Sequence, residues 1–106
     1  MAQVKFKINR RTLTACLAGE IDHHSSQQLR ELIDAEVLSQ TPEKLVLDFR
    51  GITFMDSSGV GLILGRHTMM KVLGGRLTIQ NPPMQIVRIL RLAQISVENT
   101  GEEVLV

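Results

Sequence analysis

Apolar and polar residues alternate along the first twenty positions of the chain, in two runs separated by Arg10 and Arg11. Side chains of a β-strand point alternately to opposite faces of a sheet, so each run predicts a strand with one buried face. The short polar gap between the runs predicts a hairpin. The apolar positions are Val4, Phe6 and Ile8 in the first run and Leu13, Ala15 and Leu17 in the second.

The period lengthens after Ser25, where apolar residues recur every three to four positions. This spacing is typical of a helix with one apolar face. Gln28 stands three residues after Ser25, as in a capping box, so the helix is expected to begin at Ser25. Pro42 marks the C-terminal limit of this helix. The stripe along this helix consists of Leu29, Leu32, Ile33, Glu36 and Val37.

A continuous apolar run follows at residues 45–47 and is typical of a central parallel strand covered on both faces. It leads to a polar step at residues 56–59 and then to a second helix, expected at about residues 58–73. Gly74 and Gly75 form the stop signal at the end of that helix.

Further strands are expected at residues 76–80 and 95–97, with a helix between them that follows the Asn-Pro-Pro run at 81–83. The apolar positions of this third helix are Ile86, Ile89 and Leu90. Alternation of strands and helices predicts a single α/β domain with right-handed crossovers. We therefore expect a mixed β-sheet with an N-terminal hairpin and helices packed against it.

Composition narrows the class of protein. The 106 residues suffice for one hydrophobic core. Hydrophobic residues make up 43% of the chain and charged residues 22%, which is ordinary for a globular domain. A net charge of +1 and the lack of Trp and Tyr argue against nucleic acid as a partner. The single cysteine, Cys16, excludes an internal disulfide and is expected to be a half-buried hydrophobe. No signal peptide or membrane span is evident, so we expect a cytoplasmic protein with no membrane partner.

The polar step Asp56-Ser57-Ser58-Gly59 lies at the start of the second predicted helix. The first amides of a helix lack internal partners and carry a partial positive charge, so a capping oxygen or a phosphate is stabilised there. Asp56, Ser57 or Ser58 could serve simply as the N-cap, worth about 1 kcal/mol. The alternative is that one serine is a site of charge switching. Local chemistry leaves both possibilities open.

The rest of this second helix carries two further signals. Gly59, Gly61 and Gly65 each cost about 1 kcal/mol relative to Ala, which indicates close approach by the sheet, a partner or a ligand. Gly61 and Gly65 continue with Thr68 and Val72 as a strip of small residues. The apolar sector is about twice the usual ~100° width, so it is either packed deeply or partly an exposed docking face for another protein. That sector consists of Val60, Leu62, Ile63, Leu64, Met69, Met70 and Leu73.

The acidic and histidine residues Glu20, Asp22, His23 and His24 suggest a metal site. Adjacent His side chains point in different directions and no further ligands follow at zinc-like spacing, so we expect no metal. Asp22 is instead expected to cap or orient the loop before the first helix. The serine segment does not match the Gly-x-Ser-x-Gly nucleophile motif, and the glycines miss the dinucleotide-binding spacing. We therefore expect neither an enzyme nor a cofactor.

Three segments together resemble the STAS domain of bacterial anti-sigma-factor antagonists, most closely the stage II sporulation antagonists. They are Gly-Glu-Ile-Asp-His-His at 19–24, Leu-Asp-Phe at 47–49 and Phe-Met-Asp-Ser-Ser-Gly-Val-Gly at 54–61. The resemblance runs over nearly the whole chain and implies one STAS domain over residues 1–106. The family pattern continues into a C-terminal helix, whereas residues 101–106 offer at most one or two turns, so this helix is expected to be shortened or absent.

The resemblance implies a phosphorylation-regulated anti-sigma-factor antagonist. The unphosphorylated form would bind an anti-sigma factor with GHKL-type serine kinase activity, phosphorylation of Ser58 would release it, and a PP2C-type phosphatase would reset the switch. The free protein is expected to be a monomer. The alternative is a STAS module in a stress-signalling complex or a small-ligand sensor. The implied partner contacts are Asp22, His23, Asp56, Ser57, Ser58, Gly59, Gly61 and Leu62.

Overall fold

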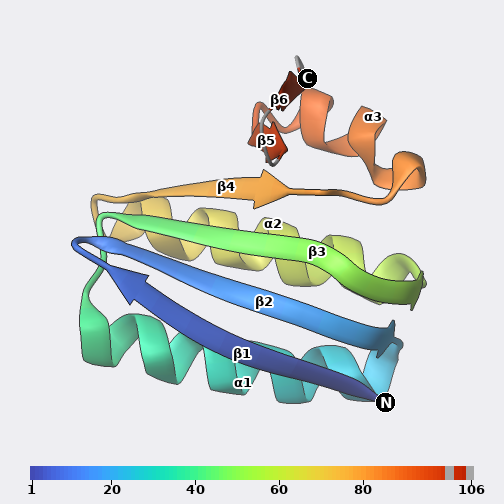
Figure 1. Cartoon of the computed structure of the whole chain (residues 1–106), viewed down its shortest axis with the longest axis horizontal. Helices are drawn as coiled ribbons and strands as arrows, with labels where there is room; N and C mark the ends of the chain where they lie inside the picture. Colours follow the sequence, from blue (N-terminus) through green and yellow to red (C-terminus); the bar gives the residue numbers. More distant parts are fainter. Residues whose placement is uncertain (100–101, 105–106) are drawn as a thin grey trace.

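Strands and helices alternate along the chain in the computed structural model, which describes residues 1–99 and 102–104 (Figure 1). This confirms the expected α/β class. The elements are β1 (Ala2–Asn9), β2 (Thr12–Ile21), α1 (His23–Gln40), β3 (Lys44–Met55), α2 (Ser57–Val72), β4 (Arg76–Gln80), α3 (Met84–Leu92), β5 (Ser96–Asn99) and β6 (Glu102–Val104).

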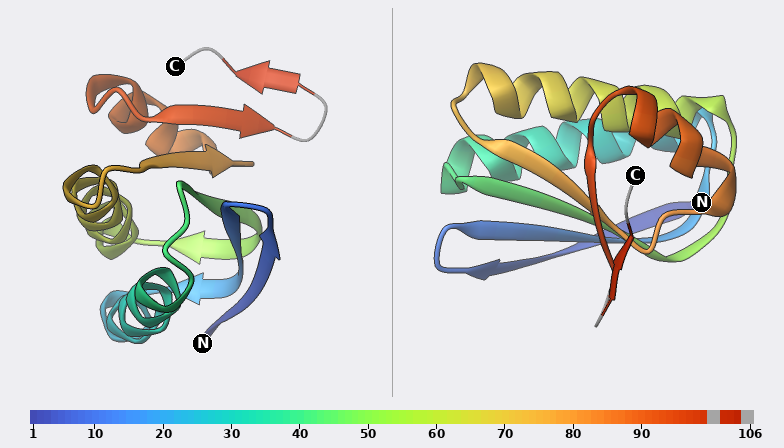
Figure 2. Two further views of the ribbon diagram at one scale, coloured as in Figure 1. Left: turned by 90° about the vertical axis from the view of Figure 1, so that its left-hand side faces the viewer. Right: turned by 90° about the horizontal axis from the view of Figure 1, so that it is seen from above.

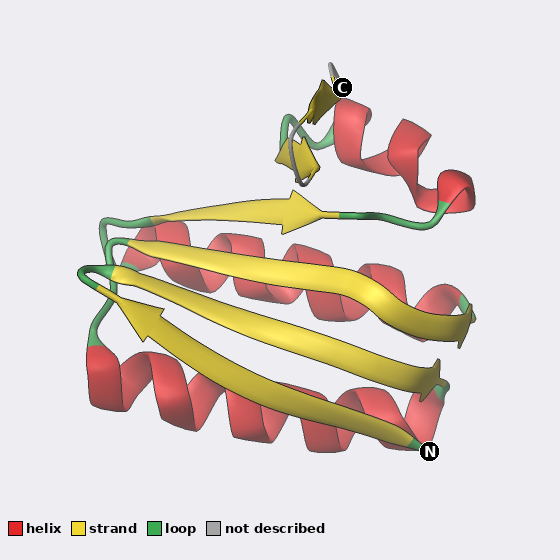
Figure 3. Ribbon diagram, viewed as in Figure 1, coloured by secondary structure: helices red, strands yellow, loops and turns green. Residues whose placement is uncertain are grey.

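The strands form one six-stranded sheet whose spatial order follows the sequence from β1 to β6. β1 and β6 are antiparallel to their neighbours, whereas β2 to β5 are parallel. Each parallel connection passes through a helix and moves one strand in the same direction across the sheet. Crossovers of one hand then place α1, α2 and α3 on the same face. Figure 2 shows this arrangement, and Figure 3 shows the long helices behind the strands.

The N-terminal hairpin is confirmed. Asn9 pairs with Thr12, so Arg10 and Arg11 form the turn, and Arg10 adopts the left-handed conformation with φ 58° that tight hairpins require. Ile8 lies in the edge strand next to this turn and remains 47% exposed. The buried face of β2 consists of Leu13, Ala15 and Leu17, and Cys16 on the other face is half-buried, as expected.

Helix α1 begins at His23, so the expected start at Ser25 is wrong by two residues. The cap is Asp22, whose carboxylate accepts a hydrogen bond from the amide of Ser25. Leu32 lies beside the row that faces the core and is 52% exposed, which contradicts its place in the expected stripe. The buried row has a spacing of four and consists of Ser25, Leu29, Ile33 and Val37.

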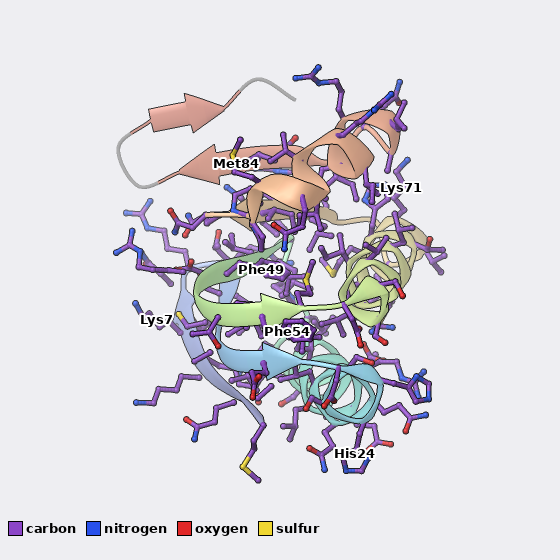
Figure 4. All side chains as sticks on the ribbon, turned by 90° about the vertical axis from the view of Figure 1, so that its right-hand side faces the viewer. Lys7, His24, Phe49, Phe54, Lys71 and Met84 are labelled. Carbon is purple, nitrogen blue, oxygen red and sulfur yellow. The ribbon has the colours of Figure 1, made fainter. Side chains whose placement is uncertain are left out.

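Strand β3 lies between β2 and β4 and is parallel to both, which confirms a central parallel strand. Leu45 and Leu47 are fully buried in the core between the sheet and the helices. Val46 is 2% exposed although it lies outside that core, so both faces of the strand are covered. Figure 4 shows the helices on one side of the sheet and Lys7 on the other.

The end of the chain differs most from expectation. Helix α3 buries Ile86 and Leu90 as expected, whereas Ile89 is 36% exposed. The last expected strand is present as β5, which begins one residue later and ends two residues later than expected. Residues 102–104 form β6, antiparallel to β5, where the expectation was a C-terminal helix that is shortened or absent. Residues 101 and 105–106, also part of that expectation, lie outside the described residues.

Candidate functional site

The starts of α1 and α2 lie side by side at one edge of the sheet, at the right of Figure 1. Their preceding strands, β2 and β3, are parallel neighbours whose last residues, Ile21 and Met55, pair with each other. The amide of Asp56 donates a hydrogen bond to the carbonyl oxygen of Ile21, with an N···O distance of 3.1 Å. Two polar segments that are far apart in the sequence are thereby joined in space.

An aspartate caps each of these helix starts. Asp22 Oδ1 accepts from the amide of Ser25, and Asp56 Oδ1 accepts from the amide of Ser58, each at 2.8 Å. Hydrogen bonds from Ser25, through its amide first and its side chain second, lower the pKa of Asp22, so this carboxylate is ionised at neutral pH. Two negative side chains therefore stand at the positive ends of adjacent helices.

The cap of α2 shows which of Asp56, Ser57 and Ser58 starts the helix. Asp56 is the cap, and the two serines occupy the first two positions of the helix. Ser57 is exposed and Ser58 is half-buried. The hydrogen bond to the cap comes from the Ser58 backbone, so its hydroxyl is not what starts the helix. A phosphate on that hydroxyl would lie in the positive field of the helix end.

The three glycines of α2 have different roles. A Cβ at Gly59 would overlap the side chain of Met55, so Gly59 allows the helix to lie close to the end of β3. A Cβ at Gly61 or Gly65 would have no neighbour within 4 Å beyond the helix's own backbone. Packing inside this chain therefore accounts for Gly59 but not for Gly61 or Gly65.

A groove of about 330 Å³ runs between α1 and α2 and includes Ser58. Four residues of α1 form one wall: His23, Ser26, Gln27 and Arg30. Five residues of α2 form the other: Ser58, Gly61, Leu62, Gly65 and Arg66. Gly61 and Gly65 present no side chains, which keeps this space open.

Arg66 is one of the groove residues that sequence reasoning missed, together with Ser26, Gln27 and Arg30. Arg66 is 7% exposed, and its Nε lies 2.8 Å from Asp34 Oδ1 in an ion pair whose N–H is poorly directed for a hydrogen bond. Burial lowers the pKa of Arg66, and Asp34 opposes that shift, so the guanidinium stays charged. Arg66 stands four residues after Leu62 and therefore on the same, apolar side of the helix. A polar residue at such a position is the sequence signal that could have indicated a buried polar group.

The expected partner contacts divide into a surface group and a buried pair. Asp22, His23, Ser57 and Gly61 are exposed, and Asp56 and Ser58 are half-buried beside them. Gly59 and Leu62 are buried, and Leu62 is only 3% exposed. Their position beneath the surface makes them supports of this site.

The wide apolar sector of α2 is explained mainly by deep packing. Leu62, Ile63 and Met70 lie in the core, so deep packing is the alternative that holds at these positions. Leu64, at 37% exposed, and Leu73, at 52%, are the members of the sector that reach solvent clearly.

The two histidines lie apart, as expected for neighbours in a helix. His23 lines the groove, whereas His24 Nε2 lies 3.4 Å from the side-chain nitrogen of Gln28 on the outer face of α1 (Figure 4). Within residues 1–99 and 102–104, no three His, Cys, Asp or Glu side chains are grouped to hold a metal ion. None of the described helices combines the length and the apolar character needed to cross a membrane.

Known proteins share this organisation. The family model for the STAS domain matches residues 3–104. The anti-sigma F factor antagonist of Lysinibacillus sphaericus is 35% identical over 86 residues, which cover 81% of this chain and 74% of that protein.

Two solved structures of SpoIIAA have the same fold. The unphosphorylated anti-sigma factor antagonist matches with a TM-score of 0.78 and 29% identity, over 94% of this chain and 89% of the other. The phosphorylated Bacillus protein matches with a TM-score of 0.78 and 28% identity, over 92% and 91%. The family model, the curated relative and the fold agree, and the chain belongs to the STAS domain family.

Proposed function

We propose that this protein is an anti-sigma-factor antagonist that is switched by phosphorylation of Ser58. The observation that carries the proposal is that the cap of α2 and the proposed phosphate acceptor are different residues. Asp56 caps the helix, which leaves the Ser58 hydroxyl free for modification. The names of the relatives support the same role, since one antagonises anti-sigma F factor and another has been solved in a phosphorylated form.

In the unmodified state, the protein docks an anti-sigma factor through the edge where α1 and α2 begin, and thereby frees the sigma factor. Asp22, His23 and Ser57 are exposed at this edge, and His23 lines the same groove as Ser58. Gly59 and Leu62 lie beneath it and hold α2 against the sheet. Their contribution to binding is to fix the position and tilt of the start of α2 relative to the sheet.

The docked anti-sigma factor acts as a GHKL-type serine kinase. The Ser58 Oγ attacks the γ-phosphorus of ATP, the bond from that phosphorus to the bridging oxygen breaks, and ADP leaves. The hydroxyl proton passes to a base on the kinase. This chain supplies the acceptor and no catalytic residue. A PP2C-type phosphatase hydrolyses the phosphoester and restores the unmodified serine.

Phosphorylation releases the partner without unfolding the domain. The phosphate adds about −1.5 to −2 charges. The helix end stabilises an anion by roughly 0.3–1 kcal/mol, and repulsion from Asp56 partly offsets this. The fold therefore stays intact, and binding is lost because a bulky dianion would have to be desolvated at the interface.

The test is binding of the purified protein to the GHKL-type anti-sigma factors of its source organism. We expect a stable complex with ADP and dissociation with ATP, together with one phosphate that tandem mass spectrometry assigns to Ser58. Ser57→Ala should remain a substrate and Ser58→Ala should not. Absence of a complex with every such anti-sigma factor would refute the proposed function, and phosphate found mainly on Ser57 would refute the assignment.

A further inference from the structure

Packing among the described residues does not explain why the groove between α1 and α2 is open. Gly61 and Gly65 are poor helix formers, and alanine at either position would meet nothing within 4 Å. Stability of the isolated fold would therefore favour alanine at both. Side chains here would instead fill the space that the glycines leave between the helices.

The same groove contains positive charge that is incompletely satisfied. Arg66 Nη1 is buried and has no hydrogen-bond partner within the described residues, while Nε faces Asp34. Arg30 lines the groove from α1 and is exposed, and it lies near enough to Arg66 to lower the pKa of that guanidinium. Arg66 is paired with Asp34, and Arg30 adds a second positive charge to the same groove, which favours an incoming anion.

We propose that this groove receives an acidic side chain of the anti-sigma factor, which passes over Gly61 and Gly65 and pairs with Arg30 and Arg66. This inference rests on the proposed function and names the chemistry of the partner at that site. Charge complementarity identifies the occupant, because Arg66 is already paired with Asp34 and a carboxylate balances the second arginine, Arg30. Arginine binds carboxylates through two parallel N–H donors, which gives the contact a defined geometry.

The position of Ser58 in this groove links the contact to the switch. Phosphorylation of Ser58 would place up to two negative charges beside the path of the partner's carboxylate. The same modification would also offer the arginines a competing anion within the chain. Electrostatic repulsion and competition at the groove both favour release.

Glycine variants test whether the groove is occupied. Gly61→Ala and Gly65→Ala should each raise the thermal midpoint by about 4–8 °C, because alanine is the better helix former. Each should weaken the complex with the anti-sigma factor about tenfold, because the new methyl group narrows the groove. Thr68→Ala is the matched control, since Thr68 is an exposed residue of the same strip of α2 outside the groove, and it should bind like the parent.

Charge variants test the occupant. Arg30→Gln should weaken binding about tenfold and reduce the dependence of Kd on salt concentration. Arg88→Gln, an equal change of charge on an exposed residue of α3, should do neither. Arg66→Gln should weaken binding further. If that variant fails to fold because Asp34 is left unpaired, Arg30→Gln and the glycine variants decide the question.

The outcomes separate this inference from the proposed function. If the parent protein forms the complex and both Arg30→Gln and Gly61→Ala bind equally well, the groove is not part of the interface and the inference fails alone. If Gly61→Ala weakens binding and Arg30→Gln does not, the occupant is not acidic and the inference fails as stated. If the parent protein forms no complex, the proposed function fails and the inference fails with it.

Discussion

Asp56→Ala and Ser58→Ala should separate the helix cap from the proposed switch, because the structure gives the cap to Asp56 and the proposed phosphorylation site is Ser58. Asp56→Ala removes the acceptor of the 2.8 Å hydrogen bond from the Ser58 amide. An N-cap side chain contributes about 0.5–2 kcal/mol, so a loss near 1 kcal/mol should lower the thermal midpoint by about 4–8 °C. Ser58→Ala keeps that hydrogen bond, since the donor is backbone, and the free energy of unfolding should change by about 0.5 kcal/mol or less.

Thermal and urea unfolding, followed by circular dichroism at one pH, measure the first part of this prediction. Binding to the anti-sigma factor with ADP and with ATP measures the second. Ser58→Ala should bind and then resist release by ATP, whereas Asp56→Ala should still accept phosphate. The exposed Ser57→Ala is the control for a serine lost from the same turn. The reasoning is refuted if Ser58→Ala loses as much stability as Asp56→Ala, because the Ser58 hydroxyl would then hold the helix start.

Three further predictions concern neighbouring positions. Leu62→Glu should unfold the domain, because Leu62 is only 3% exposed and an unpaired buried carboxylate costs several kcal/mol. The free energy of unfolding of a domain is only about 5–15 kcal/mol. A cooperative thermal transition at the parent's temperature would contradict this prediction. Ser58→Asp adds one negative charge and less bulk than phosphate, so it should weaken anti-sigma-factor binding while the thermal midpoint stays near that of the parent; unchanged affinity in a titration would count against Ser58 as the switch. The Asp22 cap has a lowered pKa, so its stabilisation is complete above the unfolded pKa of about 3.9 and is lost as the pH falls through the lower folded value. Asp22→Asn keeps a capping oxygen that does not titrate, so its thermal midpoint should fall less than the parent's below about pH 4, and parallel curves would be the contrary result.

Local patterns determined the elements of this protein. The alternation at Val4, Phe6 and Ile8 and the Gly74-Gly75 stop signal act within a few residues, and the structure places β1 and the end of α2 where they predict. The polar step at residues 56–59 likewise located the start of α2 to within one residue, and the resemblance at residues 54–61 indicated the family. Such signals can be read from the sequence because they depend on backbone conformation and side-chain periodicity. Both are determined by residues that are close together along the chain.

Which side of each helix is buried was decided only by the tertiary structure. Leu62 and Leu64 are equally apolar, yet one is in the core and the other is 37% exposed. Arg66 is polar, yet it is buried on the same side as Leu62. Periodicity shows that a helix has an apolar sector, but contact with the sheet and with α1 selects which part of a wide sector is covered.

The assembly of the site was also a tertiary result. Any of Asp56, Ser57 and Ser58 is a competent cap, and the choice of Asp56 follows from the hydrogen bond that holds its amide to Ile21 of the neighbouring strand. Gly59 and Gly61 look alike in the sequence, but only Gly59 lies against another side chain. The sequence supplied the residues of the site, whereas parallel pairing of β2 with β3 brought two distant helix starts together, because the carboxyl ends of adjacent parallel strands meet at one edge of a sheet.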